Sequence, residues 1–279
     1  QSLALARELG DRYWASLALD WSGWVARQMG DFAEARRLHT ESLALSREIG
    51  DQLGIAGSLD NLGLAAFEAG DDAEAERLFT EALTLRQATG HTWSAAVSFE
   101  HLGALALRRG DLAQAEVNFD EALAINPEYL MIQVRQGDLR LAQNRLPDAL
   151  ALYQPAVRNS LRYTNMWMAM AGLAGLAAVR GRTGDPIRAV ELLTFVRNHF
   201  ASDYATGQRV AALLTEFGAA LTPAEHAAAE ARGRSLTLDA ITAAELPPAA
   251  ELPPAAEAPP APELPPATKW PPEAERPAA

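Results

Sequence analysis

Residues 59–83 read LDNLGLAAFEAGDDAEAERLFTEAL, and this stretch decides the fold. Its apolar residues recur at helical spacing on both sides of Gly70-Asp71. Glycine suits the left-handed residue just past the end of a helix, and aspartate suits the N-cap of the next helix. The stretch therefore predicts two antiparallel helices that are separated by a tight turn.

The same Gly-Asp signal for a helix end and a helix start recurs along the chain every 20 residues. It stands at Gly10-Asp11, Gly30-Asp31, Gly50-Asp51, Gly70-Asp71 and Gly110-Asp111, with Gly90-His91 in the remaining place. Alternate helices differ, so the full period is 40 residues, and the first helix of each pair carries a glycine at Gly23, Gly63 or Gly103. We expect these glycines to mark helix crossings, with Phe79 and Phe119 filling the space beside two of them and a packed His39 beside the first.

This pattern resembles the tetratricopeptide repeat, in a 40-residue variant. The third unit carries the resemblance most fully, through Leu102-Gly103, Ala106, Gly110-Asp111-Leu112, Ala115, Phe119, Ala122 and Pro127. The usual period of the family is about 34 residues. The spacing contracts to that value after Pro127, which predicts that Gly137 lies inside a helix. The resemblance implies an all-α fold, a right-handed α-solenoid of antiparallel helix pairs.

We divide the chain into three parts. The repeats are assigned to residues 1–200, as a partial unit at 1–11 and units at about 12–51, 52–91, 92–127, 128–160 and 161–200. Residues 201–246 are predicted to be a helical closure, with helices near 203–219, 223–233 and 236–245. Residues 247–279 repeat a Pro/Ala/Glu-rich hexapeptide, which predicts a disordered, polyproline-II-like tail that is either a spacer or an SH3-like ligand.

Residues 2–11 parallel residues 42–51, so the first helix matches the second helix of a pair. We therefore expect the full gene product to extend upstream. Residues 231–241 resemble the segment that closes the repeat array in bacterial STAND-type regulators, although Glu230 stands where those proteins usually show Trp. Such arrays often precede a LuxR-type DNA-binding domain. The resemblance implies the C-terminal repeat region of a larger cytoplasmic signalling regulator, which could bind its own upstream domains.

Composition and missing motifs exclude several functions. A net charge of −12 argues against nucleic acid as a partner, and the absence of cysteine excludes thiol nucleophiles and cysteine-ligated zinc. No apolar run approaches the roughly 20 residues of a membrane span. Phosphate-binding, dinucleotide-binding, HExxH and GxSxG motifs are also missing. We expect no catalytic residue, no cofactor and no metal site.

The remaining candidate is a groove along the concave face, which the first helix of each unit lines in such arrays. Counting from each unit's glycine places these residues in the groove: Asp20, Trp21, Trp24, Arg27, Asp60, Asn61, Leu64, Phe67, Glu100, His101, Arg135 and Asp138. An acid recurs in three units, at Asp20, Asp60 and Glu100, beside large apolar residues.

Two interpretations of this stripe stay open. One is a trough that binds a protein or peptide with basic and apolar side chains, or a small inducer. The other is a solvated acidic face beside packed aromatic residues. An alternative function is a hydrolase- or phosphatase-like regulator with a site around Asp60, Glu100 and His101.

Overall fold

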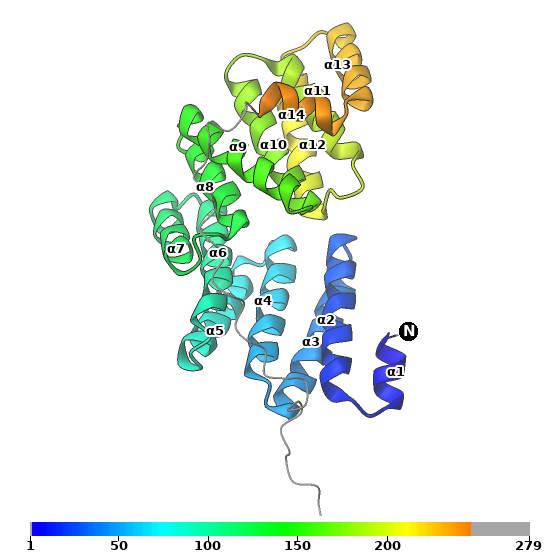
Figure 1. The fold of residues 1–279 in the computed structure, drawn as a ribbon, viewed down its shortest axis with the longest axis vertical. Helices are drawn as coiled ribbons and strands as arrows, with labels where there is room; N and C mark the ends of the chain where they lie inside the picture. The colour runs from blue at the N-terminus through cyan, green and yellow to red at the C-terminus, as the bar shows by residue number, and fades with distance from the viewer. Residues whose placement is uncertain (1, 247–279) are drawn as a thin grey trace, which may run out of the picture. The chain divides into compact units, whose positions relative to one another are not determined.

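The computed structural model describes residues 2–246, and every regular element in that range is an α-helix (Figure 1). The helices are α1 (Ser2–Glu8), α2 (Arg12–Gln28), α3 (Phe32–Ile49), α4 (Gln52–Glu68), α5 (Asp72–Ala88), α6 (Thr92–Arg108), α7 (Leu112–Ile125), α8 (Leu130–Ala142), α9 (Leu146–Arg162), α10 (Met166–Arg182), α11 (Pro186–Asn198), α12 (Tyr204–Gly218), α13 (Pro223–Ser235) and α14 (Leu238–Glu245). The tail predicted at 247–279 lies outside the described residues.

The turns between helices form as the Gly-Asp pattern predicts. Each glycine of the pattern lies in the left-handed region, with φ from +68° at Gly10 to +84° at Gly70. The following aspartate caps the next helix, as when Oδ1 of Asp111 accepts a hydrogen bond from the backbone N–H of Gln114 at 3.0 Å. His91 makes no such bond. The local signals therefore set the helix ends.

The two helices of each pair cross at the predicted glycine. A Cβ on Gly63 would lie 2.5 Å from Cε1 of Phe79, and a Cβ on Gly103 would lie 2.4 Å from Cε1 of Phe119. Both rings are completely buried. Gly137 lies inside α8 as predicted, and Tyr153 fills the same place beside it. In the first pair that place belongs to the imidazole of His39, which is also completely buried.

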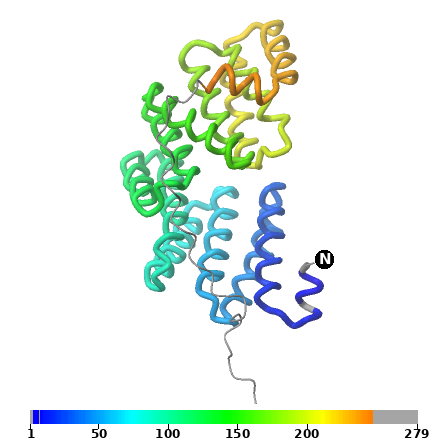
Figure 2. The backbone as a smooth tube through the Cα atoms, viewed as in Figure 1, coloured from blue at the N-terminus to red at the C-terminus, as the bar shows by residue number. Residues whose placement is uncertain are grey.

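The pairs stack so that their first helices form one row. α2, α4, α6, α8, α10 and α12 each contact the next helix of this series. The array curves within residues 2–246 until α12 returns to α2, as the backbone trace in Figure 2 shows. There the rings of Phe32 and Tyr204 meet edge to face, with centroids 5.0 Å apart. This return contact joins residues that the sequence analysis left unconnected.

The last helices, α12 to α14, agree closely with the three predicted for the closure. Thr222 and Glu225 form a reciprocal capping box at the start of α13. At the end of α14 the buried carboxylate of Glu245 accepts hydrogen bonds from Arg180 and Arg188, at 2.9 and 2.8 Å. These bonds tie α14 to α10 and α11. Within the described residues, no helix combines the length and hydropathy that a membrane crossing requires.

Candidate binding groove

The acidic side chains of the predicted stripe form hydrogen bonds and ion pairs with other residues of this protein. Oδ2 of Asp20 accepts a hydrogen bond from Ser58 at 3.1 Å, and Oδ1 of Asp60 accepts one from Ser98 at 3.2 Å. Each bond joins one unit to the next. Asp60 also forms an ion pair with Arg86, and only 3% of its surface is exposed. The interpretation of a solvated acidic face is therefore wrong, and a basic partner could reach Asp60 only by displacing Arg86.

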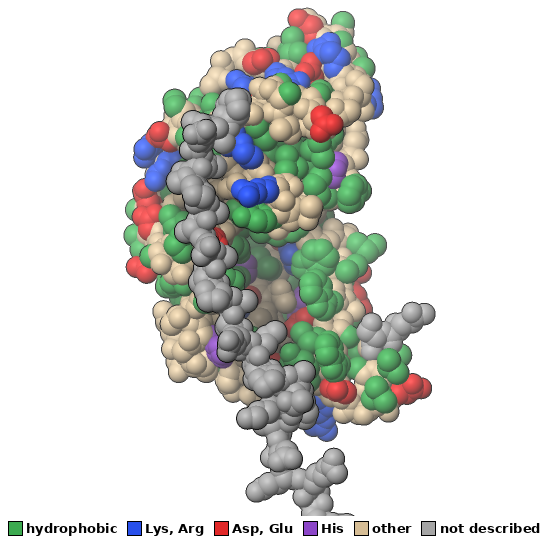
Figure 3. All heavy atoms as spheres, viewed as in Figure 1, with side chains coloured by type: hydrophobic (Ala, Val, Ile, Leu, Met, Phe, Trp, Pro, Cys, Tyr) green, Lys and Arg blue, Asp and Glu red, His purple; other side chains and the backbone are tan. Residues whose placement is uncertain are grey.

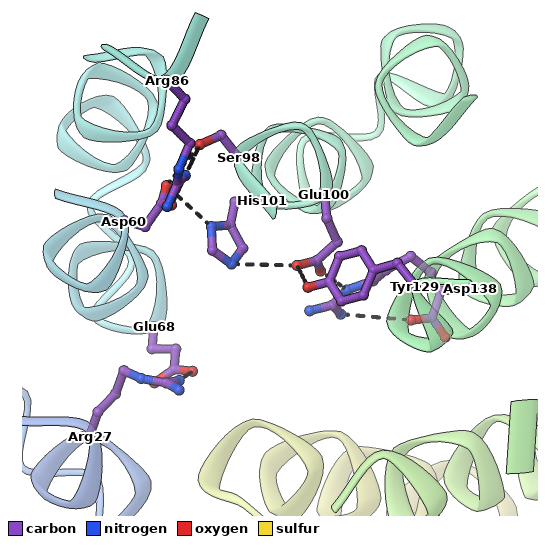
Figure 4. Close-up of polar contacts among 10 residues, drawn as sticks. Arg27, Asp60, Glu68, Arg86, Ser98, Glu100, His101, Tyr129 and Asp138 are labelled. Atoms are coloured by element: carbon purple, nitrogen blue, oxygen red, sulfur yellow. Dashed lines mark hydrogen bonds and ion pairs between the residues drawn. The ribbon is translucent and has the colours of Figure 1, made fainter. Parts of the chain in front are cut away.

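The third acid of the stripe belongs to a larger polar network (Figure 4). Glu100 is 2% exposed, and its Oε1 accepts a hydrogen bond from Nε of Arg135 at 2.5 Å. The other oxygen, Oε2, lies 3.5 Å from the hydroxyl of Tyr129, a donor that sequence reasoning missed. Arg135 continues the network to Oδ2 of Asp138, at 3.8 Å. The structure thus brings together three residues predicted for the groove, as partners of one another.

The network ends on α12. Nη1 of Arg209 lies 2.7 Å from Oδ1 of Asp138, which also accepts a hydrogen bond from the hydroxyl of Tyr153 at 2.6 Å. The tyrosine hydroxyl in turn accepts a hydrogen bond from Arg209 at 3.2 Å. Arg209 lies outside the repeats, so no repeat spacing pointed to it.

Burial and charge fix the protonation states of this network. Burial, followed by the charge of Asp138, raises the pKa of Tyr153, and burial together with Glu100 raises that of Tyr129. Burial lowers the pKa of Arg135, but Glu100 and Asp138 more than offset this, so the pKa lies above its usual range. At neutral pH the tyrosines therefore donate and the arginine stays charged, which makes the network a fixed structural element.

A second ion pair faces the same interior. Arg27, a predicted groove residue, pairs with Glu68, which sequence reasoning missed because it lies one position beyond Phe67 on α4. Only 7% of the Glu68 side chain is exposed, and its Oε2 has no hydrogen-bond partner among the described residues. Burial, opposed by Arg27 and reinforced by the carboxylate of Asp203, raises the pKa of Glu68. Asp203, the N-cap residue of α12, therefore contributes to the electrostatics of this ion pair.

The predicted apolar residues are more accessible. Trp21 is 66% exposed, and its ring meets that of Trp24 edge to face, with centroids 6.1 Å apart. Hydrophobic side chains gather over α2 in the space-filling view (Figure 3). Asn61 and Leu64 on α4 are half-buried. Phe67 is covered by the guanidinium of Arg108, 3.5 Å from the ring centroid. Of the predicted groove residues on α2 and α4, Trp21, Trp24, Asn61 and Leu64 are therefore the ones a partner can reach.

The residues of the alternative hydrolase site do come together. Nδ1 of His101 lies 3.5 Å from Oδ1 of Asp60, and Nε2 lies 3.4 Å from Oε2 of Glu100. The imidazole also lies against the ring of Phe79, with centroids 4.9 Å apart, and is buried. Both carboxylates already pair with arginines. Among the described residues, no group of three or more His, Cys, Asp or Glu side chains is arranged to hold a metal ion.

The comparisons with known proteins agree with this architecture. Residues 15–88 and residues 54–128 each match the family model of the tetratricopeptide repeat. The repeats that the sequence predicts are therefore confirmed in this part of the array. No curated protein matches the sequence.

Two solved structures are similar to this chain. BtubC (BKLC) from P. vanneervenii is 17% identical with a TM-score of 0.53, and the match covers 78% of this chain and 86% of that one. TTC0263, a thermophilic tetratricopeptide repeat protein of Thermus thermophilus, is 18% identical with a TM-score of 0.50, over 72% of this chain and 100% of that one. These likenesses show the fold: the molecule is an all-α solenoid of tetratricopeptide-like helix pairs.

Proposed function

We propose that this protein is a non-catalytic scaffold that binds a protein, a peptide or an inducer along the row formed by α2, α4 and α6. Tetratricopeptide repeat proteins are generally protein-interaction scaffolds. The sequence also suggests a role for each part of the chain. Residues 1–200 are the repeat portion of a larger cytoplasmic bacterial regulator, residues 201–246 close the array, and upstream domains of the same polypeptide are candidate partners.

The exposed pair Trp21 and Trp24 is the observation that carries the proposal. Two neighbouring tryptophans left open on one helix expose apolar surface of the kind that anchors protein interfaces. Asn61 and Leu64 stand at the equivalent positions of α4, the next helix of the row, and both are half-buried. The acids Asp20, Asp60 and Glu100 on the same row of helices contribute rigidity, because their hydrogen bonds and ion pairs join consecutive units.

A selection of displayed random peptides on the full chain tests this function. We expect the selected peptides to bind the wild type and to lose at least tenfold in affinity when Asn61→Arg and Leu64→Arg are combined. Thr84→Arg combined with Gln87→Arg, both on the exposed face of α5, is the matched control because it adds the same two charges to the second helix of the same unit. Equal binding by the groove variant and the wild type would refute groove binding.

A further inference from the structure

A cleft of about 640 Å³ opens where the two ends of the array meet. Its walls are the end of α2, the turn before α10 and the turn before α12. Six of the fifteen exposed large hydrophobic side chains among the described residues line it: Trp24, Val25, Met29, Tyr163, Trp167 and Phe200. Phe200 is 90% exposed. Such a concentration of apolar surface in one place marks a binding site more often than scattered exposed residues do.

The cleft lies where the two ends of the array contact each other, and one aromatic pair packs at that contact. The ring of Tyr204 packs against Phe32 and also lies over Gly30, where an added Cβ would come 2.9 Å from the tyrosine ring. Few other residues join α2 to α12. A ligand in the cleft would therefore touch both ends of the array and add to the contact that holds them together.

The buried polar network of the interior contains more carboxylates than guanidinium groups. Within the described network, four guanidinium groups face five carboxylates: Arg27, Arg86, Arg135 and Arg209 against Asp60, Glu68, Glu100, Asp138 and Asp203. Arg86 and Arg209 pair with Asp60 and Asp138. Arg27 pairs with Glu68, and burial, with a further contribution from the charge of Asp203, raises the pKa of Glu68 although Arg27 opposes it.

Asp203 connects the cleft to that interior. It lines the cleft, its Oδ1 caps α12 by accepting the N–H of Thr206 at 2.7 Å, and its charge acts on Glu68. Oδ1 of Asn165, which also lines the cleft, is a buried acceptor without a hydrogen-bond partner among the described residues, so Asp203 and Asn165 place two acceptors there. An arginine or lysine side chain brings only donors, which is the complement of these two acceptors.

We infer that the cleft docks a peptide segment that carries an arginine or lysine next to an aromatic or other large apolar side chain. The apolar side chain lies among Trp24, Trp167 and Phe200, and the cation lies at Asp203 and Asn165, which line the cleft. Aromatic faces also attract the cation on its way in. This inference rests on the proposed scaffold function, because it names the chemistry of one partner and the place where that partner docks.

Fluorescence anisotropy with two dye-labelled octapeptides tests the inference on the full chain. One probe has a Trp-Arg core flanked by Gly and Ser, and the other carries citrulline, the uncharged isostere, in place of Arg. We expect the arginine peptide to bind at least tenfold more tightly, with a difference that shrinks as salt rises. Equal binding of the two probes, or no binding of either, would overturn the inference.

Three variants assign the contacts. Asp203→Asn, which keeps an acceptor at the N-cap of α12, should remove the preference for arginine while apolar binding remains, and Phe200→Ser should weaken both probes about equally. Phe200 lies in an exposed turn, so its replacement cannot be dismissed as a failure to fold. Trp93→Ala removes an exposed tryptophan outside the cleft and should change neither affinity. An unchanged affinity in Phe200→Ser would refute docking in the cleft.

The outcomes separate this inference from the proposed function. If capture of selected peptides depends on Asn61 and Leu64 but not on Asp203 or Phe200, the scaffold function holds and docking in the cleft is refuted. Self-association in sedimentation experiments that Phe200→Ser abolishes would identify a second copy of this chain as the occupant, and would also overturn the inference.

Discussion

The crossing of α4 and α5 offers a sharp test of how the repeats pack. A Cβ on Gly63 would lie 2.5 Å from Cε1 of Phe79, whereas ordinary contacts begin at 3.4 Å. In Gly63→Ala the ring must therefore retreat by about 0.9 Å, the difference between these distances. The ring is completely buried and lies against His101, so it has no free direction. Overpacking of this kind costs about 1–3 kcal/mol. Replacing a helical glycine with alanine stabilises the helix by about 0.5–1 kcal/mol, which offsets part of this cost.

The net expectation for Gly63→Ala is a loss of about 1–2 kcal/mol, which lowers the melting temperature by roughly 2–8 °C in a chain of this size. Circular dichroism at 222 nm during heating measures it. Gly57→Ala in the same helix is the control, because nothing lies within 4 Å of its added Cβ, and it should raise the melting temperature. Combining Gly63→Ala with Phe79→Leu should recover part of the loss. The reasoning fails if Gly63→Ala melts at or above Gly57→Ala.

Three further predictions concern caps and buried charges. Asp111→Ala should lose about 0.5–2 kcal/mol of stability in urea titrations, whereas His91→Ala, which removes no cap hydrogen bond, should lose less than Asp111→Ala does. Asp60→Ala leaves the buried guanidinium of Arg86 without its carboxylate and should cost about 3–5 kcal/mol by the same measurement; a loss below 1 kcal/mol would show that the pair does not stabilise the fold. Glu68 binds its proton more tightly in the folded protein than in the unfolded chain, so wild-type stability should fall as pH rises from about 4.3 through the raised pKa. Glu68→Gln should lack this decline, and parallel pH profiles for the two proteins would contradict the assignment.

The helix ends and crossings follow from the sequence because the interactions that set them are local. A capping aspartate bonds to an N–H three residues ahead, and each crossing glycine meets a residue 16 positions later in the same pair. Neither depends on the curvature of the array. The same locality allowed Gly137 to be placed inside a helix from spacing alone.

The partners of the groove residues do not follow from local pattern. Glu68 lies 41 residues from Arg27, and Arg209 reaches Asp138 and Tyr153 from outside the repeats. Those contacts exist because the stacked units curve until α12 lies opposite α2 and α4, and the curvature is a sum of small rotations between units. One signal was available in the sequence. Ser58 and Ser98 stand at the same place in consecutive units, each 38 residues after the acid that it bonds.

Residues that recur at the same place in successive 40-residue units therefore differ in role from residues that do not recur. Asp20 and Asp60 recur with their serine partners because the first two junctions between full units use the same contact. Residues that bind a single partner need not be repeated in every unit, so they can depart from the 40-residue period. Trp24 is replaced by Leu64 at the equivalent place in the next unit, and Glu68 by Arg108 in the unit after its own. Trp24 lines the cleft and Glu68 pairs with Arg27 in the interior, so departures from the period are the positions at which to look for recognition of a partner.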